Sequence, residues 1–413
     1  MLMTNDPDHP VSTCREGCDI GDIFRQYGPA YRKIHQIPYR MAKVMRAIEH
    51  CKTASLGGHV FECDQCGHQQ IAYNSCRNRH CPQCQAAARG KWLDNRRQEL
   101  LPVKYFHIVF TIPDSLNPIA LQNQTEIYKM LFKASSETLL ELSLDPKHLG
   151  AKIGFIALLH TWGQNLLDHP HIHMIVPAGG LSYDDRKWIA SKKNFFIHVK
   201  VLSRMFRGKF LDYLQSKYDQ NGLSFNGKIE CFRTNFRFKE LVDSLYRKEW
   251  VVYSKPSFKH PEAVLNYLGR YTHRVAITKH RITHIENDRI YFRWKDYRNE
   301  NKNKIMSLDI FEFIRRFLLH VLPGKFVKIR HYGFLSNRNK AWSLQRCRKL
   351  LGKLKTKTIK TFEDLLFELS GLKYHLCPVC ARGQMIEVGI LEPVSHAPPY
   401  RYPFTCPVFL RNR

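Results

Sequence analysis

Apolar and polar residues recur along the chain with two periods, and each period predicts a different kind of element. Apolar positions spaced three and four residues apart predict helices at 22–50, 85–100, 118–143, 200–218, 236–247, 260–271, 309–321, 340–351 and 361–370. Short apolar or alternating runs predict strands at 103–113, 152–162, 171–177, 250–254, 274–278, 281–285, 289–294 and 325–331. The run at 181–189 follows the turn "AGG" and predicts a hairpin. The sequence shows no internal repeat.

One predicted strand has an unusual polar face. In "HPHIHMIVPAGG", alternation places His169, His171 and His173 on one face of the strand and Ile172 and Met174 on the other. Three imidazoles on one face could hold a metal ion or an anion. The alternative is a solvated, histidine-rich edge. The segment alone does not decide between these readings.

Length and composition set the broad class of the protein. The chain has 413 residues, enough for two or three domains, and 44% of them are hydrophobic. No run approaches the roughly 18 apolar residues that a transmembrane helix needs, and the N-terminus lacks a secretory signal pattern. We therefore expect a cytoplasmic, nucleoid-associated protein without a membrane partner. Because cytoplasmic thiols stay reduced, the 13 cysteines indicate metal binding rather than disulfides.

Charge identifies the expected partner. The chain has 65 Lys and Arg against 36 Asp and Glu, a net charge of +29, with dense basic stretches at 77–97, 192–209 and 325–360. Any one stretch could be a solvated basic face, but an excess of this size indicates a polyanion, most often nucleic acid. Aromatic residues lie among the cations in "RIYFRWKDYR" (289–298), an arrangement that suits stacking on unpaired bases. No long amphipathic basic helix favours a membrane surface instead.

A block of cysteines between residues 51 and 84 predicts zinc. Cys63 and Cys66 form one Cys-x-x-Cys knuckle, and Cys81 and Cys84 form a second one 14 residues later. Paired knuckles are typical of a zinc ribbon, in which four thiolates surround one tetrahedral ion. The alternative is a group of free, buried cysteines. We expect one structural Zn²⁺ on these four sulfurs.

Further potential ligands surround this block. A second zinc ion would take its ligands from Cys51, His59, Cys76 and His80. Cys377 and Cys380 form a third knuckle, with no obvious partner in the sequence, so zinc binding there is left open. Beside the ligands, Arg77 and Arg79 are expected to contact DNA phosphates.

The histidines become more informative together with the strand before them. His171 and His173 are two imidazoles side by side, and His160 ends the preceding strand eleven residues upstream. If the two strands are antiparallel, His160 lies across from the pair. Three neutral imidazoles leave positions open for phosphate oxygens on Mg²⁺ or Mn²⁺. Gln164 and His169 are the competing third ligands.

A nucleophile is available about a hundred residues later. In "NYLGRYTHRVAIT", Tyr267 and Tyr271 lie four residues apart on a predicted helix, so both phenols project from one face. A buried aromatic pair is the usual meaning of this spacing. Here the neighbours include Arg270 and Arg274, which favour DNA binding over a hydrophobic core. Such cations would stabilise a phenolate, whose pKa is otherwise about 10.

At these residues the chain resembles a known family. The block "SCRNRHCPQCQ" precedes "YFHIVFTIP", "LHTWGQNLLDHPHIHMIVPAGG", "YLGRYTHRVAIT" and "HYGFL". This order is similar to that of the two-tyrosine HUH transposases of insertion sequence ninety-one, over residues 24–335. The resemblance implies an α+β fold: an N-terminal helical and zinc-ribbon module, then an HUH nuclease domain with a central antiparallel sheet flanked by helices. It also implies rolling-circle-like transposition through single-stranded DNA, without an acidic triad.

We accordingly expect three domains and a DNA-cutting enzyme. Residues 1–100 would bind zinc and DNA, 101–335 would form the nuclease, and 336–413 a basic C-terminal region with a third knuckle. The expected partner is DNA, especially single-stranded ends of the element and of the target, and a homo-oligomer is compatible with this reading. The alternatives are a plasmid rolling-circle replication initiator and a zinc-ribbon nucleic-acid-binding protein without catalysis.

Overall fold

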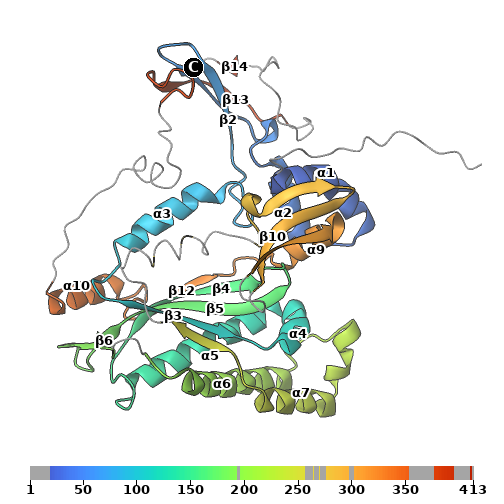
Figure 1. Ribbon diagram of the computed structural model, residues 1–413. Helices are drawn as coiled ribbons and strands as arrows, with labels where there is room; N and C mark the ends of the chain where they lie inside the picture. The colour runs from blue at the N-terminus through green and yellow to red at the C-terminus, as the bar shows by residue number, and fades with distance from the viewer. Residues whose placement is uncertain are drawn as a thin grey trace, which may run out of the picture.

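The computed structural model describes most of the chain. The described residues are 19–192, 196–255, 264, 269, 276–296, 302–352, 376–394 and 410–411. Within them the strands form four sheets, of five, four, three and two strands. The predicted α+β class is confirmed, because helices and antiparallel sheets occur in the same chain (Figure 1). None of the described helices combines the length and the apolar character that a membrane span requires.

The largest sheet has five strands in the order β12-β4-β5-β3-β8, and all neighbours are antiparallel. Its strands are β3 (Tyr105–Thr111), β4 (Gly154–Trp162), β5 (Asp168–Pro177), β8 (Val252–Lys255) and β12 (Ile329–Gly333). Helices cover one face, below the sheet in Figure 1, and α3 (Gln85–Arg97) lies on the opposite side. The covering helices are α4 (Asn117–Gln122), α5 (Gln124–Leu144), α6 (Val199–Asp219) and α7 (Asn235–Arg247).

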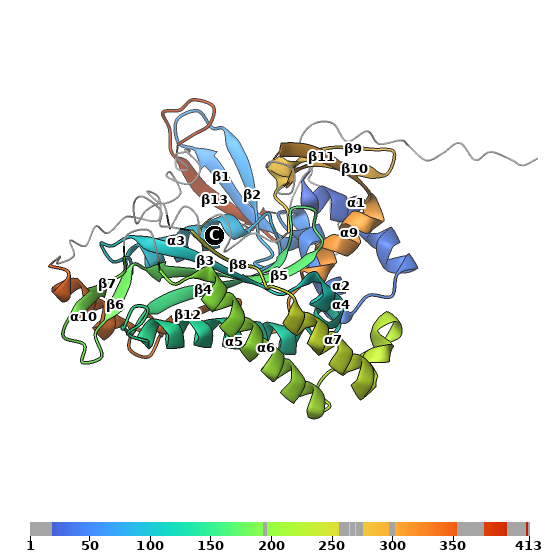
Figure 2. The ribbon, with the colours of Figure 1, turned by 60° about the horizontal axis from the view of Figure 1, so that its bottom comes forward.

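The main hydrophobic core lies between this sheet and its covering helices. Figure 2 shows the same helices against the sheet from another side. Strand alternation sends Phe110, Ile172 and Met174 into the core, where each side chain is fully buried. Phe206 of α6 packs edge-on against Phe110, with 5.1 Å between ring centroids. Because every second residue of β5 is committed to this core, the intervening residues face the other side of the sheet.

A second core joins the N-terminal helices to a later part of the chain. Helices α1 (Ile20–Ile34) and α2 (Tyr39–His50) pack with α9 (Ile310–Leu319) and with the sheet of β9 (Ile282–Glu286), β10 (Arg289–Asp296) and β11 (Lys302–Asp309). Phe24 meets Phe317 edge-on, with centroids 5.2 Å apart. The helix predicted over 22–50 is thus two helices, separated by residues 35–38, with Pro38 as the N-cap of the second.

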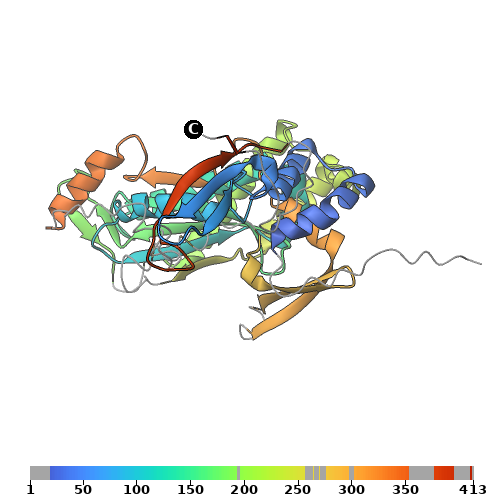
Figure 3. The same cartoon turned by 90° about the horizontal axis from the view of Figure 1, so that it is seen from above.

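The four-stranded sheet combines strands from the N-terminal part of the chain with strands from its C-terminal part. Its order is β14-β13-β1-β2, from β1 (Gly58–Cys63), β2 (Gln69–Tyr73), β13 (Met385–Leu391) and β14 (Leu410–Arg411). Seen from above in Figure 3, red β13 lies beside the blue strands. This pairing joins stretches that the sequence assigns to different domains, so the division at residues 100 and 335 stays a prediction.

The remaining elements agree with the sequence pattern in part. The hairpin of β6 (Gly179–Leu181) and β7 (Trp188–Ala190) and helix α10 (Lys340–Leu350) lie where they were predicted. The strand predicted at 274–278 is wrong at its described positions, since 276–278 form no strand. Strand β11 was missed, because its run of Lys and Asn hides the alternation. The helix predicted at 361–370 lies outside the described residues.

Candidate active site and metal centres

Three histidines converge on the face of the central sheet opposite the covering helices. Strands β4 and β5 are antiparallel, and their register places His160 directly across from His171, as the spacing predicts. His173 lies two residues further along the same face. The potential ligand nitrogens of these three rings all lie within 4.8 Å of one another. All three side chains are buried.

The competing third ligands have other contacts, and the ring of His169 also lies beside that of His171, with 5.1 Å between centroids. The ring of His169 turns toward Asp114, with its Nδ1 3.6 Å from the carboxylate oxygen. Gln164 follows β4 in a turn, where its main-chain carbonyl accepts a hydrogen bond from Arg281. Of the two histidine candidates, His160 is the one whose ring nitrogen lies within 4.8 Å of those of His171 and His173.

Hydrogen bonds orient two of the rings. The carbonyl of His169 can only accept, so Nδ1 of His171 donates to it over 2.6 Å, which leaves a lone pair on Nε2 of the neutral ring. Nε2 of His171 lies 3.0 Å from Nε2 of His173. Nδ1 of His173 in turn lies 2.8 Å from Nε2 of His107, a buried residue of β3. His107 can therefore take the Nδ1 proton of His173 in a hydrogen bond and free its Nε2 for a ligand.

Burial keeps these imidazoles neutral. Loss of solvent lowers the pKa of His171 to about 3, with a smaller contribution from His169. Loss of solvent also holds the pKa of His173 well below its usual value, and repulsion from His160 adds to the effect. The pKa of His107 falls to about 4, mainly through burial and then through Lys255. At neutral pH the rings of His171, His173 and His107 are therefore uncharged and can offer lone pairs.

This geometry fits a six-coordinate metal ion. Metal–ligand bonds of about 2.1 Å at right angles place neighbouring ligand atoms about 3.0 Å apart. The separation of the His171 and His173 Nε2 atoms is 3.0 Å. The residues present therefore fit a divalent ion held by two or three imidazoles.

The segment that carries the tyrosines has two described residues, and both lie on this side of the sheet. Val264 is buried in a cluster with Tyr105 and Ile175, which share the histidine face. Gly269 lies against Leu93 of α3. Tyr267, Tyr271, Arg270 and Arg274 themselves lie outside the described residues.

The described cysteines form two clusters, and neither has a ligand set that the sequence predicts. Each cluster has four sulfurs within 4.8 Å of one another: Cys51, Cys76, Cys81 and Cys84 in the first, and Cys63, Cys66, Cys377 and Cys380 in the second. The predicted ligand set of Cys63, Cys66, Cys81 and Cys84 is therefore wrong. The reason is the hairpin of β1 and β2, which carries Cys63 and Cys66 to its tip at the end of a strand about 17 Å long.

The histidines proposed for a second zinc ion lie outside both clusters. Nδ1 of His59 lies 3.0 Å from a carboxylate oxygen of Glu387 on β13. Nε2 of His80 accepts a hydrogen bond of 3.1 Å from the main-chain nitrogen of Leu322. The predicted set of Cys51, His59, Cys76 and His80 is thus corrected: its two cysteines cluster with Cys81 and Cys84, and its two histidines have other contacts.

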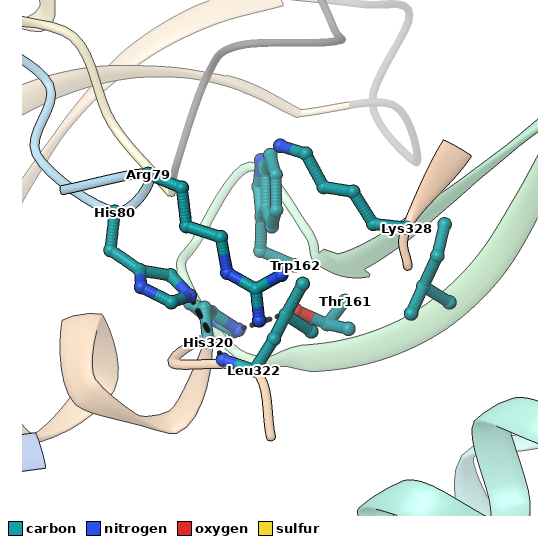
Figure 4. A pocket seen from close by; sticks show the side chains of 8 residues that line it. Arg79, His80, Thr161, Trp162, His320, Leu322 and Lys328 are labelled. Atoms are coloured by element: carbon teal, nitrogen blue, oxygen red, sulfur yellow. Dashed lines mark hydrogen bonds between the residues drawn. The ribbon is translucent and has the colours of Figure 1, made fainter. Parts of the chain in front are cut away.

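The two arginines beside the cysteines differ in environment. Arg77 is exposed. Arg79 donates to the carbonyls of Phe326 and Pro323 over 2.5 and 2.7 Å, so its guanidinium is held by the main chain, and its contact with DNA stays a prediction. It also lines a small basic pocket with His320 and Lys328 (Figure 4). Burial lowers the pKa of Lys328 to about 8, and Arg79 adds to the effect.

Sequence reasoning missed His107 as a partner of the cluster. Its signal was present, because "YFHIVF" places one histidine in an otherwise apolar strand. What the pattern could not supply was the strand order. His107 of β3 is paired with Ile175 of β5. Ile175 lies two residues after His173, on the same face of the sheet.

Family models of known proteins match two parts of the chain, one that contains the N-terminal cysteines and one that contains the histidine cluster. The family model described as "Putative transposase" matches residues 154–341, and one described as "Transposase zinc-binding domain" matches residues 23–112. The chain is 50% identical over 390 residues to "Putative transposase y4qJ" of Sinorhizobium fredii (strain NBRC 101917 / NGR234), covering 93% of this chain and 98% of that protein. It is 28% identical over 291 residues to "Transposase for insertion sequence element IS801" of Pseudomonas savastanoi pv. phaseolicola, covering 70% and 68%. No solved structure is similar enough to count as a match.

Proposed function

This chain belongs to the insertion sequence ninety-one family of transposases, and from that membership we propose that it nicks and rejoins single-stranded DNA through a 5'-phosphotyrosine. The transferred strand then moves by a rolling-circle-like route. The observation that carries the proposal is the buried cluster of His160, His171 and His173. All three residues, together with Tyr267 and Tyr271, fall within the stretch 154–341 that matches the transposase model.

The histidine cluster supports a metal-dependent nuclease rather than a passive binding protein. Three neutral imidazoles on a rigid sheet would hold Mg²⁺ or Mn²⁺, which would supply charge to polarise a phosphate oxygen. His107 and the carbonyl of His169 fix the orientation of His173 and His171. Such outer partners make a ligand set rigid and are characteristic of metal sites.

The tyrosines supply the covalent chemistry in this proposal. The phenolate oxygen of Tyr267 or Tyr271 attacks phosphorus, and the bond from phosphorus to the 3'-oxygen breaks. The proton that leaves the phenol balances the proton gained by the 3'-hydroxyl. Attack of a 3'-hydroxyl on the phosphotyrosine reverses these bond changes and rejoins a strand. Val264 and Gly269 support this assignment, because they bracket Tyr267 in sequence and lie on the histidine side of the sheet.

Tyr267 and Tyr271 lie four residues apart in a stretch for which the sequence predicts a helix, and phenols one helical turn apart can alternate at one site. We expect Tyr267→Phe and Tyr271→Phe each to retain some cleavage but to lose transposition. Only the double variant should lose every covalent adduct with a labelled oligonucleotide in denaturing gels with Mn²⁺. Normal transposition by either single variant would contradict the alternating scheme, and adducts from the double variant would contradict the choice of nucleophile.

Tyr253 gives the matched control. It lies on the histidine face with its ring centroid 6.4 Å from that of His107, and 42% of its surface is exposed. Tyr253→Phe should therefore cleave at the wild-type rate. Loss of adducts in this variant alone would transfer the role of nucleophile to Tyr253.

The histidines are tested with the same oligonucleotide. His171→Ala should abolish cleavage by either tyrosine and leave single-strand binding nearly intact, because only the metal ligand is lost. His107→Ala should lower cleavage by about 10-fold to 100-fold, the usual effect of removing an outer partner of a metal ligand. Higher Mn²⁺ should restore the His107 variant and not the His171 variant. Ordinary cleavage by His171→Ala would refute the metal assignment.

A further inference from the structure

The second cysteine cluster joins residues that are far apart in the chain. The Sγ atoms of Cys63 and Cys380 are 3.6 Å apart across a sequence separation of 317, and those of Cys66 and Cys377 are 3.6 Å apart across 311. The stretches that match the two family models end before the third knuckle, at residues 112 and 341. Neither match therefore accounts for Cys377 and Cys380.

The two knuckles have the same local geometry. In the first, the nitrogen of Gly67 donates to the carbonyl of Cys63 over 3.0 Å, and in the second Ala381 donates to Cys377 over 2.9 Å. Both turns end in the left-handed region, with φ of 68° at Gly67 and 55° at Ala381. A non-glycine residue there is unusual and indicates that the turn is held by its surroundings.

Main-chain amides point at the sulfurs. The nitrogen of Val379 lies 3.4 Å from Sγ of Cys377, and the nitrogen of Gly383 lies 3.3 Å from Sγ of Cys380. Such amides stabilise the negative charge of a thiolate, which is the form of cysteine that binds metal.

The sulfur separations fit one tetrahedral ion. Zn–S bonds of about 2.3 Å place the sulfurs of a tetrahedral site about 3.8 Å apart. The two cross-knuckle separations of 3.6 Å are close to this value and far from the length of a disulfide bond, about 2.0 Å. The first cluster gives a reference, since Cys76 and Cys84 are 3.7 Å apart there.

We propose that this chain binds a second structural zinc ion, which fastens the C-terminal segment 376–394 to the N-terminal hairpin through Cys63, Cys66, Cys377 and Cys380. The ion lies at one end of the β1–β13 ladder, where Cys63 is paired with Met385. Next to it, the nitrogen of Gln384 donates to a carboxylate oxygen of Asp64 over 2.8 Å. The metal and the ladder thus stabilise the same contact.

The sheet needs such a fastening because it buries little apolar surface. Ile386 and Val388 of β13 are 52% and 50% exposed. The strand is otherwise buried only at its far end, at Leu391. A few strands without a substantial core are marginally stable in water, and in small modules a bound metal supplies the missing free energy.

The experiment counts zinc in the full-length protein by mass spectrometry of the metal. Wild type should hold two zinc ions per chain. The double variant Cys377→Ser/Cys380→Ser should hold one, and so should Cys51→Ser/Cys76→Ser. Cys231→Ser is the matched control, because Cys231 is exposed and belongs to neither cluster, and it should hold two. One zinc ion in wild type, or two in Cys377→Ser/Cys380→Ser, would overturn the proposal.

Hydrogen exchange locates the effect. In Cys377→Ser/Cys380→Ser the amides of β13 should lose protection by at least about tenfold, while those of β4 and β5 keep it, because the central sheet has its own core. Unchanged protection of β13 would overturn the fastening role. Neither measurement depends on DNA cleavage, so this inference and the proposed nuclease can fail independently.

Discussion

Asp168 is an uncompensated acid at the start of β5. The side chain is 8% exposed, and neither carboxylate oxygen has a hydrogen-bond partner among the described residues. Burial raises the pKa of Asp168 to about 7. Because the folded state prefers the protonated form, folding stability falls as pH rises from about 4 to about 7 and stays low above that range.

Asp168→Asn should remove this dependence. At pH 8 the variant should be more stable than wild type by about 4 kcal/mol, and the difference should vanish near pH 4. Urea unfolding at both pH values measures it, with the exposed Asp212→Asn as the control. A pH-independent difference between Asp168→Asn and wild type would show that the carboxyl does not titrate as described.

At the same scale, sequence pattern predicted the histidine triad better than the zinc ligands. His160 could be placed because a short antiparallel hairpin relates it to His171 by local spacing alone. The sulfur sets depended on contacts across more than 300 residues, between the knuckle of Cys63 and that of Cys380. No local sequence pattern contains information on such distant contacts. The two knuckles that are close in sequence were therefore assigned to one zinc ion.

Among the elements, β12 depends on one glycine. Gly333 ends the strand with φ of 58°, and a Cβ at this position would overlap the carbonyl oxygen of Ile153 just before β4. The junction holds the start of β4, the strand that carries His160 near its other end.

Gly333→Ala should therefore destabilise the protein by at least about 2 kcal/mol, through the left-handed backbone and the steric overlap. Gly324→Ala is the control, because nothing lies within 4 Å of its Cβ position, and it should change stability by less than about 0.5 kcal/mol. Unfolding midpoints in urea report both. Equal midpoints for the two variants would contradict this account.

Elements with a strong local signal were predicted well, and elements set by tertiary contacts were not. The buried strand β5 and the long helix α6 have unambiguous periods and lie where expected. Strand β11 has a polar sequence and is ordered by pairing with β10 along its whole length. The partner of β1 could not be predicted for the same reason. β13 is fixed by its pairing register with β1, which its composition does not reveal.

For the whole molecule, charge should govern binding to DNA. With a net charge of +29, the protein should neutralise many phosphates and release their counterions. Affinity for a single-stranded oligonucleotide should fall by about a thousandfold between roughly 50 and 200 mM salt. Fluorescence anisotropy measures this loss, and a peptide nucleic acid of the same sequence, which has no phosphates, should show little salt dependence. Equal salt dependence of the two ligands would contradict the electrostatic account.

The pairing of β1 with β13 also determines when this sheet can be completed during synthesis of the chain. A ribosome makes the chain from the N-terminus, so β1 emerges long before the strand that completes its sheet. At about 5–20 residues per second, the interval between residues 63 and 385 lasts roughly 15 to 65 seconds. During that interval the β1 edge has no β13 partner, and a chain that stops before residue 376 never acquires one. Chains truncated before residue 376 therefore keep an unpaired β1 edge, which can pair with other chains.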